Sequence, residues 1–155
     1  MEIEISIENV IENVTETLRY YSGKHAEKPE DFFRYGACGA DRPMLIRLLG
    51  EGAAWIGARV GQRLERYEND GSALAFEFRT GRAAIGKETI LKTLLTRILE
   101  RRIIYGWLLL AGASPALQRD EESELMAASF LELVKAGGDG GEGSEGCFTR
   151  WVPPI

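Results

Sequence analysis

One glycine-rich turn comes closest to a pattern that could do chemistry. It runs from Gly81 to Glu88 and reads Gly-Arg-Ala-Ala-Ile-Gly-Lys-Glu. The glycine spacing and Lys87 would suit a loop that binds phosphate, and the turn lies between an expected strand and an expected helix. In such loops a Ser or Thr follows the lysine and binds magnesium, whereas here Glu88 would set a carboxylate beside the phosphate. A divergent nucleotide-binding enzyme that uses Lys87 is therefore the least favoured function, and a turn leading into a helix is the better interpretation.

The other titratable side chains do not form a catalytic set. His25 is the only histidine, and its polar surroundings favour a solvated loop residue over a general base. Cys38 and Cys147 have neither a zinc-ligand spacing nor the pattern of a disulfide framework, so we expect two free thiols. The acidic residues from Asp120 to Glu124 lack the alternation of a calcium loop and suit the first turns of a helix. We therefore expect no enzyme activity, no cofactor and no metal ion.

Arginines recur at helical spacing in two places, and either set could face phosphate. Glutamates interleave both sets, which favours ion pairs within the chain or with an acidic neighbouring subunit. The formal net charge is −5 and the sequence pI is about 5.1, which argues against broad attraction to nucleic acid or an anionic membrane. We therefore expect no sequence-specific nucleic acid among the partners. The two sets are Arg59, Arg63 and Arg66, and Arg97, Arg101 and Arg102.

No segment of the sequence predicts insertion into a membrane. Residues Met1 to Glu4 lack the basic stretch and apolar stretch of a secretory signal, so we expect none. The most apolar run, Ile103 to Ala113, is about half the ~20 residues that span a bilayer. We interpret this run as the buried end of a helix and expect no membrane partner.

The chain of 155 residues, 45% of them hydrophobic, is long enough for one domain with a substantial core. Apolar residues at three- and four-residue steps predict a mainly α fold, a four-helix bundle-like domain with a short β element between the second and third helices. We expect one helix from about Ser6 to Ser22 and a second from the start Asp41-Arg42-Pro43 to about Glu68. A third would begin after Gly86 and stop at Gly112, and a fourth would run from Ser114-Pro115 to about Ala136. Residues 1–136 would form this helical domain.

The β element is predicted from Leu74, Phe76 and Phe78, which alternate with less apolar residues after the turn signal Asn69 to Gly71. This strand needs a partner strand. An N-terminal strand is one candidate, because the isoleucines at positions 3, 5 and 7 also alternate with polar residues. The other two candidates are a strand at Arg82 to Ile85 and a strand of another subunit. We take Phe76 and Phe78 as candidate partner-binding residues.

The second predicted helix carries a face of small residues. A glycine in a helix interior costs about 1 kcal/mol relative to alanine, so several glycines on one face imply close approach of another helix. That helix could belong to the same chain or to another subunit. The small residues are Gly50, Ala54, Gly57, Ala58 and Gly61.

The C-terminal part of the chain is expected to be a linker followed by a docking arm. Residues 137–146 combine glycine, acidic residues and serine, a composition that does not favour folding by itself. Residues 147–155 are apolar and stiffened by two prolines. Large apolar side chains gain by leaving water, so we predict that the arm binds either its own body or another chain. The partner-binding residues of this arm are Phe148, Trp151, Val152 and Ile155.

From Asp41 to Ala136 the order of features resembles the head-tail connector, or head-completion, proteins of tailed phages and prophages. The features are the helix start Asp41-Arg42-Pro43, the strand at Leu74 to Phe78, the long helix ending in Ile104 to Leu109, and a charged last helix. The resemblance implies a virion protein, assembled in the host cytoplasm, that forms a ring between portal and tail proteins by subunit-subunit contacts. The alternative is a cytoplasmic adaptor or regulator that presents its C-terminal peptide to a partner protein.

Overall fold

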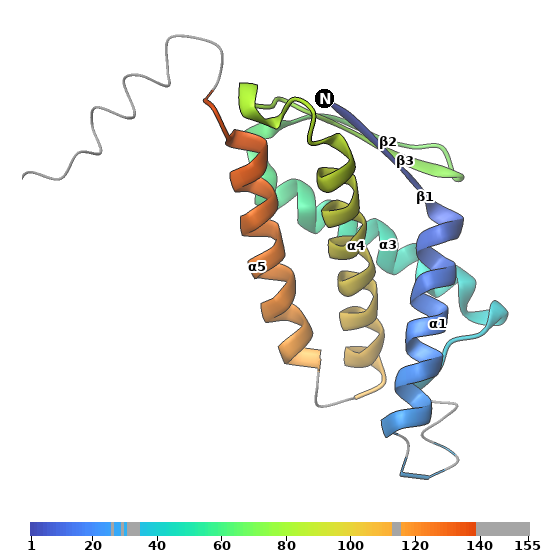
Figure 1. The fold of residues 1–155 in the computed structure, drawn as a ribbon. Helices are drawn as coiled ribbons and strands as arrows, with labels where there is room; N and C mark the ends of the chain where they lie inside the picture. The colour runs from blue at the N-terminus through green and yellow to red at the C-terminus, as the bar shows by residue number, and fades with distance from the viewer. Residues whose placement is uncertain (26, 29, 31–34, 113–115, 139–155) are drawn as a thin grey trace, which may run out of the picture.

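The computed structural model describes residues 1–25, 27, 28, 30, 35–112 and 116–138. These residues form four long helices and a small antiparallel sheet (Figure 1), which confirms the prediction of a mainly α fold. Helices α1, α4 and α5 lie side by side, α3 crosses behind α4, and the sheet lies across one end of the helices. In chain order the elements are β1 (Glu2–Ser6), α1 (Ile7–His25), α3 (Arg42–Val60), β2 (Leu64–Asn69), β3 (Ala73–Phe78), α4 (Glu88–Leu110) and α5 (Ala116–Lys135).

The sheet pairs the strands in the order β1-β3-β2, so the predicted strand is the central one. Ile3 of β1 and Tyr67 of β2 both lie opposite Phe76. Successive side chains of a strand point to opposite faces, and Phe76 and Phe78 accordingly share the face that is completely buried. The expectation that these two phenylalanines bind a partner was therefore wrong. The N-terminal strand and β2 supply the pairing that the sequence left open.

Helix α3 is shorter than predicted, ending at Val60 instead of near Glu68. Gly61 has a positive φ of 59°, a conformation that glycine adopts readily, and the chain then leaves the helix. Residues Leu64–Asn69 form β2, because the central strand offers them backbone hydrogen-bond partners. Arg66 therefore lies on the sheet beside Glu77, with a nitrogen-to-oxygen distance of 3.2 Å, and the first arginine set does not form one helical strip.

The turn between β2 and β3 is held by the side chain of Asp70. Its carboxylate accepts hydrogen bonds from the backbone amides of Ser72 and Ala73 and from the Ser72 hydroxyl, each at 2.8 Å. Gly71 has a φ of 88°, which explains the glycine in the predicted turn. The hydrogen bond from the Ala73 amide has the largest effect, followed by those from Ser72. Together they favour the charged form of Asp70 and lower the pKa of its carboxyl group.

We expect Asp70→Ala to lower the melting temperature at pH 7. A carboxyl group whose pKa is lowered on folding stabilises the protein above its unfolded pKa, and this contribution disappears as pH falls through the folded pKa. The melting-temperature difference between wild type and variant should therefore shrink in acid, as measured by thermal unfolding across a pH series. Asp70→Asn, which keeps a neutral acceptor oxygen, is the control. A difference that is the same at every pH would contradict this account.

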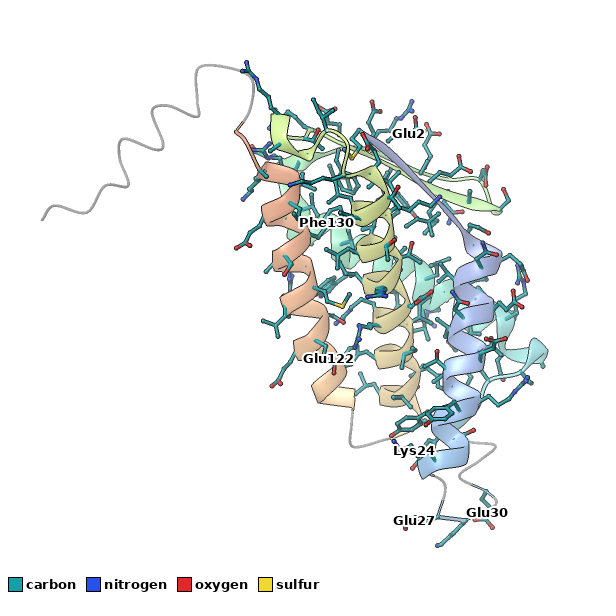
Figure 2. All side chains as sticks on the ribbon, in the orientation of Figure 1. Glu2, Lys24, Glu27, Glu30, Glu122 and Phe130 are labelled. Carbon is teal, nitrogen blue, oxygen red and sulfur yellow. The ribbon has the colours of Figure 1, made fainter. Side chains whose placement is uncertain are left out.

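The core lies between the sheet and the helices, with α4 at its centre. The α1 stripe, Val10, Val14 and Leu18, is completely buried, and Ser6 at the start of this helix accepts a hydrogen bond from the Asn9 amide at 3.3 Å, as a capping residue does. Figure 2 shows the side chains and labels Phe130 of α5, whose ring centroid lies 5.2 Å from that of Phe78. The central helix α4 buries Leu91, Leu95, Ile98, Leu99, Ile103, Ile104 and Leu108.

Close approach of α3 and α4 depends on two glycines other than those predicted. A Cβ added to Gly52 would lie 3.3 Å from Cβ of Arg102, and one added to Gly106 would lie 2.7 Å from Cδ2 of Leu48. Gly50 and Gly61 of the predicted small-residue face instead have open space where a Cβ would stand. The helix that approaches α3 is therefore α4 of the same chain, and it packs against a different face.

Candidate interaction surface

The glycine-rich turn at residues 81–87 does not form a phosphate cradle. All seven of its backbone amides donate hydrogen bonds within the protein, five of them to carbonyl oxygens of the same turn or of residues just after α5. The Gly81 amide donates to the Val134 carbonyl at 2.7 Å. The Gly86 amide donates to Oε1 of Glu88 at 3.2 Å, so a carboxylate of the chain lies where a phosphate would have to bind. The preceding strand is antiparallel to both of its neighbours, which also differs from the parallel sheet that precedes such a loop.

The other residues considered for chemistry remain apart. Cys38 is an exposed free thiol, and its backbone amide donates to the Asp41 carboxylate at 2.8 Å. His25 is the last residue of α1, and Cys147 lies outside the described residues. Among the residues that the structure describes, no group of three or more His, Cys, Asp or Glu side chains could hold a metal ion. None of the helices in this part of the chain is long and apolar enough to cross a membrane.

A broad, open hollow of about 680 Å³ lies between β1, α1 and α4, but its lining is largely charged or hydroxylic. Asn13 donates a hydrogen bond to Oε1 of Glu100 at 2.9 Å across it. Acidic and basic side chains both line the hollow, which is typical of a solvated surface. Its charged residues are Glu2, Glu4, Glu88, Lys92, Arg97 and Glu100.

The most specific surface is a groove between α3 and α4, called here the α3–α4 groove. It encloses about 280 Å³, and Gly52 and Gly106 lie where the two helices approach each other. Because these two residues have no side chain, the side chains of Arg102 and Leu48 pack against their backbones and the two helices approach closely. Arg47 and Glu51 form an ion pair at its edge, with a nitrogen-to-oxygen distance of 3.2 Å. Apolar and aromatic side chains make up most of the lining: Met44, Leu48, Trp55, Tyr105, Leu109 and Leu110.

Large apolar side chains are exposed beside this groove. Leu109 is 55% exposed and Leu110 is 67% exposed at the end of α4, and Met44 is 37% exposed across from them on α3. A second hollow of about 350 Å³ adjoins the groove through Met44 and Leu110 and is also lined by Trp107. The Trp107 indole is fixed in place, since its Nε1 donates to the Tyr35 carbonyl at 2.8 Å. An apolar patch of this kind on a polar protein is typical of an interaction site.

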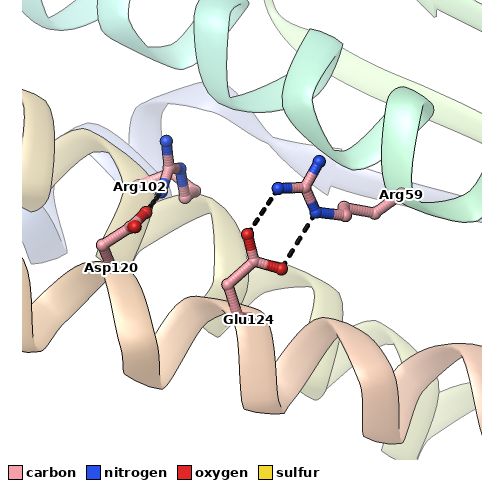
Figure 3. A network of polar contacts seen from close by, with 4 residues as sticks. All are labelled: Arg59, Arg102, Asp120 and Glu124. Atoms are coloured by element: carbon pink, nitrogen blue, oxygen red, sulfur yellow. Dashed lines mark hydrogen bonds and ion pairs between the residues drawn. The ribbon is translucent and has the colours of Figure 1, made fainter.

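The wall of the groove is stiffened by a network of charged and aromatic side chains that joins α3, α4 and α5. The Arg59 guanidinium lies 4.7 Å from the Trp55 ring centroid, and the Arg102 guanidinium lies 4.4 Å from it. Arg102 also lies 4.6 Å from the centroid of the Tyr105 ring. Figure 3 shows how the two arginines are held from α5: Arg59 forms two parallel hydrogen bonds with Glu124, and Arg102 pairs with Asp120.

The ion pair between Arg59 and Glu124 shifts the titration of both groups. The side-chain hydrogen bond from Arg59 lowers the pKa of Glu124, and the same bond raises the pKa of Arg59. Both side chains are 44% exposed, so solvent weakens their attraction and the pair chiefly fixes geometry. Asp120 and Glu124 of α5 therefore act as anchors for arginines of α3 and α4.

Comparison with protein-family models, with curated proteins and with solved structures found no match for this chain. Inference about its function therefore rests on its own residues. The α3–α4 groove and its exposed leucines are the features to be explained.

We expect Arg102→Ala to destabilise the fold by about 2 kcal/mol, because the variant loses the Asp120 pair and two cation–π contacts. The Arg102 side chain is only 13% exposed, so water cannot replace these contacts fully. Denaturant unfolding measures the change. Arg47→Ala, which removes an exposed ion pair on the groove edge, should cost less than about 0.5 kcal/mol. Equal effects of the two substitutions would show that the network does not stabilise the groove wall.

The residues predicted to contact a partner divide into two groups. Phe76 and Phe78 lie in the core, as described above. Phe148, Trp151, Val152 and Ile155, with the whole arm and the linker after Gly138, lie outside the described residues.

The exposure of Leu109 and Leu110 differs from what the sequence predicts. The run from Ile103 to Ala113 is predicted to be a buried helix end, but of its residues that the structure describes only Ile103, Ile104 and Leu108 are buried. One signal was present in the sequence. Four consecutive large apolar residues, Trp107 to Leu110, surround more of a helix than one packed face can bury.

Proposed function

We propose that this protein is a non-enzymatic assembly subunit that works by contacts with other copies of itself. The observation that best supports this proposal is the apolar surface at Met44, Leu109 and Leu110 beside the α3–α4 groove. Three large apolar side chains in one patch are costly to leave in water and gain by burial in an interface. The hydrogen-bonded amides of the glycine-rich turn remove the main reason to consider an enzyme that binds nucleotides.

In its specific form the proposal is a head-tail connector, or neck, subunit of a tailed phage. Such a subunit would form a homo-oligomeric ring, with its helices as a bundle-like body, and would join portal and tail proteins in a virion assembled in the host cytoplasm. The features that support this form are the proline in the first turn of α3, the antiparallel strand β3, and the long helix α4 with an apolar end.

The charge distribution fits a subunit that meets protein. Ion pairs between neighbouring elements neutralise several exposed arginines, including Arg42 with Glu8 at 2.8 Å and Arg66 with Glu77. A chain with a net charge of −5 and paired arginines has little attraction for nucleic acid. The groove, in contrast, has an apolar lining with charged residues at its edge, which is the usual anatomy of a protein interface.

The test of this proposal is the oligomeric state of the full chain, measured by light scattering and native mass spectrometry, alone and with portal and tail proteins. We expect wild type to form closed oligomers under at least one condition, and Leu109→Glu/Leu110→Glu to shift them towards monomers. The matched control is Leu125→Glu, which replaces a leucine that is 71% exposed on α5 outside the groove. Monomers under all conditions would overturn the proposal. Monomers that bind an unrelated protein through residues 148–155 would instead support the adaptor alternative.

A further inference from the structure

We infer that the α3–α4 groove is the docking site for the C-terminal arm, residues 147–155, of a neighbouring copy of the same chain. This inference deepens the proposed function and rests on it. It gives the subunit contact a defined polarity, in which each copy offers an arm and receives one. A contact between two different surfaces repeats from copy to copy and closes into a ring when the rotation allows it.

The groove suits the arm in size and chemistry. A cavity of about 150 Å³ is enough to bind benzene, so the groove, at about 280 Å³, has room for the indole of Trp151. Segments with consecutive prolines favour an extended conformation and bind grooves lined with aromatic side chains. Trp55 and Tyr105 line this groove, and the arm carries Pro153 and Pro154. Trp107 lies in the adjoining hollow, which could receive a second apolar side chain of the arm.

The charges at the groove edge are compatible with the arm. Arg150, immediately before Trp151, is the only charged residue of the arm sequence. Glu51 on the edge of the groove has a side chain that is 59% exposed, and it forms an ion pair with the exposed Arg47. A pair between Arg150 and Glu51 at the rim would orient the arm and would contribute little affinity by itself.

The position at which α5 ends favours docking on a neighbour over docking on the same chain. The end of α5 lies at the glycine-rich turn, where the Ala83 amide donates to the Ala136 carbonyl at 3.0 Å. The groove lies towards the opposite end of α5, because its Arg102 pairs with Asp120. From Asp120 to Lys135 the helix rises about 22 Å at 1.5 Å per residue.

The direction of the linker, more than its length, separates docking on the same chain from docking on a neighbour. Ten residues of the composition found at positions 137–146 have a typical end-to-end span of about 16–19 Å. Residues 147–150 add to this reach, so length alone permits docking on the same chain, but the linker would then have to run back along α5. Its acidic residues would then lie beside exposed Glu121 and Glu132. A groove on an adjacent copy imposes neither constraint.

The test is site-directed cross-linking between two kinds of full-length chain, both carrying Cys38→Ser. One kind keeps Cys147 as its only thiol, and the other carries Cys147→Ser and Leu110→Cys. With a short bismaleimide linker we expect a covalent heterodimer, and Trp151→Ala in the arm donor should weaken docking by about 30-fold or more, as loss of a central aromatic anchor does. The control replaces Leu110→Cys by Leu125→Cys, an equally exposed position outside the groove, and should give no heterodimer.

A third chain with Cys38→Ser and Leu110→Cys and with Cys147 retained distinguishes the two docking modes, because docking within one chain gives a concentration-independent intramolecular product. That product alone would overturn docking on a neighbour. Persistent oligomers in native mass spectrometry without any groove cross-link would overturn this inference and leave the proposed function standing. Monomers under all conditions would overturn the proposed function itself.

Discussion

Replacement of Phe78 by alanine is expected to destabilise the fold by about 3–5 kcal/mol. The side chain is completely buried and bridges two layers of the structure, because its ring stacks on Phe76 at a centroid distance of 5.9 Å and meets Phe130 of α5 edge-on. Its removal leaves a cavity between the sheet and the helices that the surrounding residues can fill only in part. In a domain of this size the melting temperature should fall by about 10 °C, which thermal unfolding at low protein concentration will measure.

The control for Phe78→Ala is Tyr67→Ala on the edge strand β2. Tyr67 packs on Phe76 with a centroid distance of 5.1 Å but is 39% exposed, so its removal should cost about 1 kcal/mol. The two variants together also test whether Phe78 belongs to the core or to a partner interface. If Phe78→Ala changed only the association of subunits and left the melting temperature of the monomer unchanged, the phenylalanine would be a contact residue and our description of the core would be wrong.

Gly81→Ala is the second substitution with a large expected effect, a loss of about 3 kcal/mol. An added Cβ would stand 2.2 Å from the Ala136 carbonyl oxygen and less than 3 Å from two further backbone oxygens, those of Lys135 and Gly138. Backbone atoms cannot move aside by changing a rotamer. The turn must therefore separate from the end of α5, and the hydrogen bond from the Gly81 amide to Val134 must lengthen or break.

The control for Gly81→Ala is the same change at Gly50, where an added Cβ meets no atom within 4 Å. In the interior of α3 the alanine should stabilise the protein by about 1 kcal/mol through its higher helix propensity. Chemical denaturation measures both free energies of unfolding. A Gly81→Ala variant as stable as wild type would show that the turn is not packed against α5 as described.

The candidate interaction surface could be predicted only in part. Periodicity correctly located the long helix α4, but a single helix does not reveal how many of its apolar residues a neighbour will cover. Leu108 and Leu109 are adjacent in the sequence, yet one is completely buried and the other is 55% exposed, because only Leu108 faces the packed interior. The groove itself depends on Gly52 and Gly106, which come from helices separated by the whole sheet hairpin.

The sequence by itself determined the features that depend on neighbours along the chain. Helices α1, α4 and α5, the strand at Phe76 and the turn at Asn69 to Gly71 follow from local spacing of apolar residues and from the local chemistry of Asp and Gly. Glu88 likewise argued from the sequence alone against a phosphate-binding loop, and in the structure its carboxylate accepts a hydrogen bond from the Gly86 amide.

The tertiary structure alone decided the features that depend on segments far apart in the chain. Residues Leu64–Asn69 have a pattern that also suits a helix, and they form β2 because β3 supplies backbone partners at that position. The first strand pairs with a segment about seventy residues away, which buries Phe76 and Phe78 and removes them from the surface. Hydrogen bonds between distant segments satisfy backbone groups that have no partner nearby in the sequence. Packing between the same segments decides which apolar side chains are buried and which stay exposed. These contacts therefore fix both the core and the exposed groove.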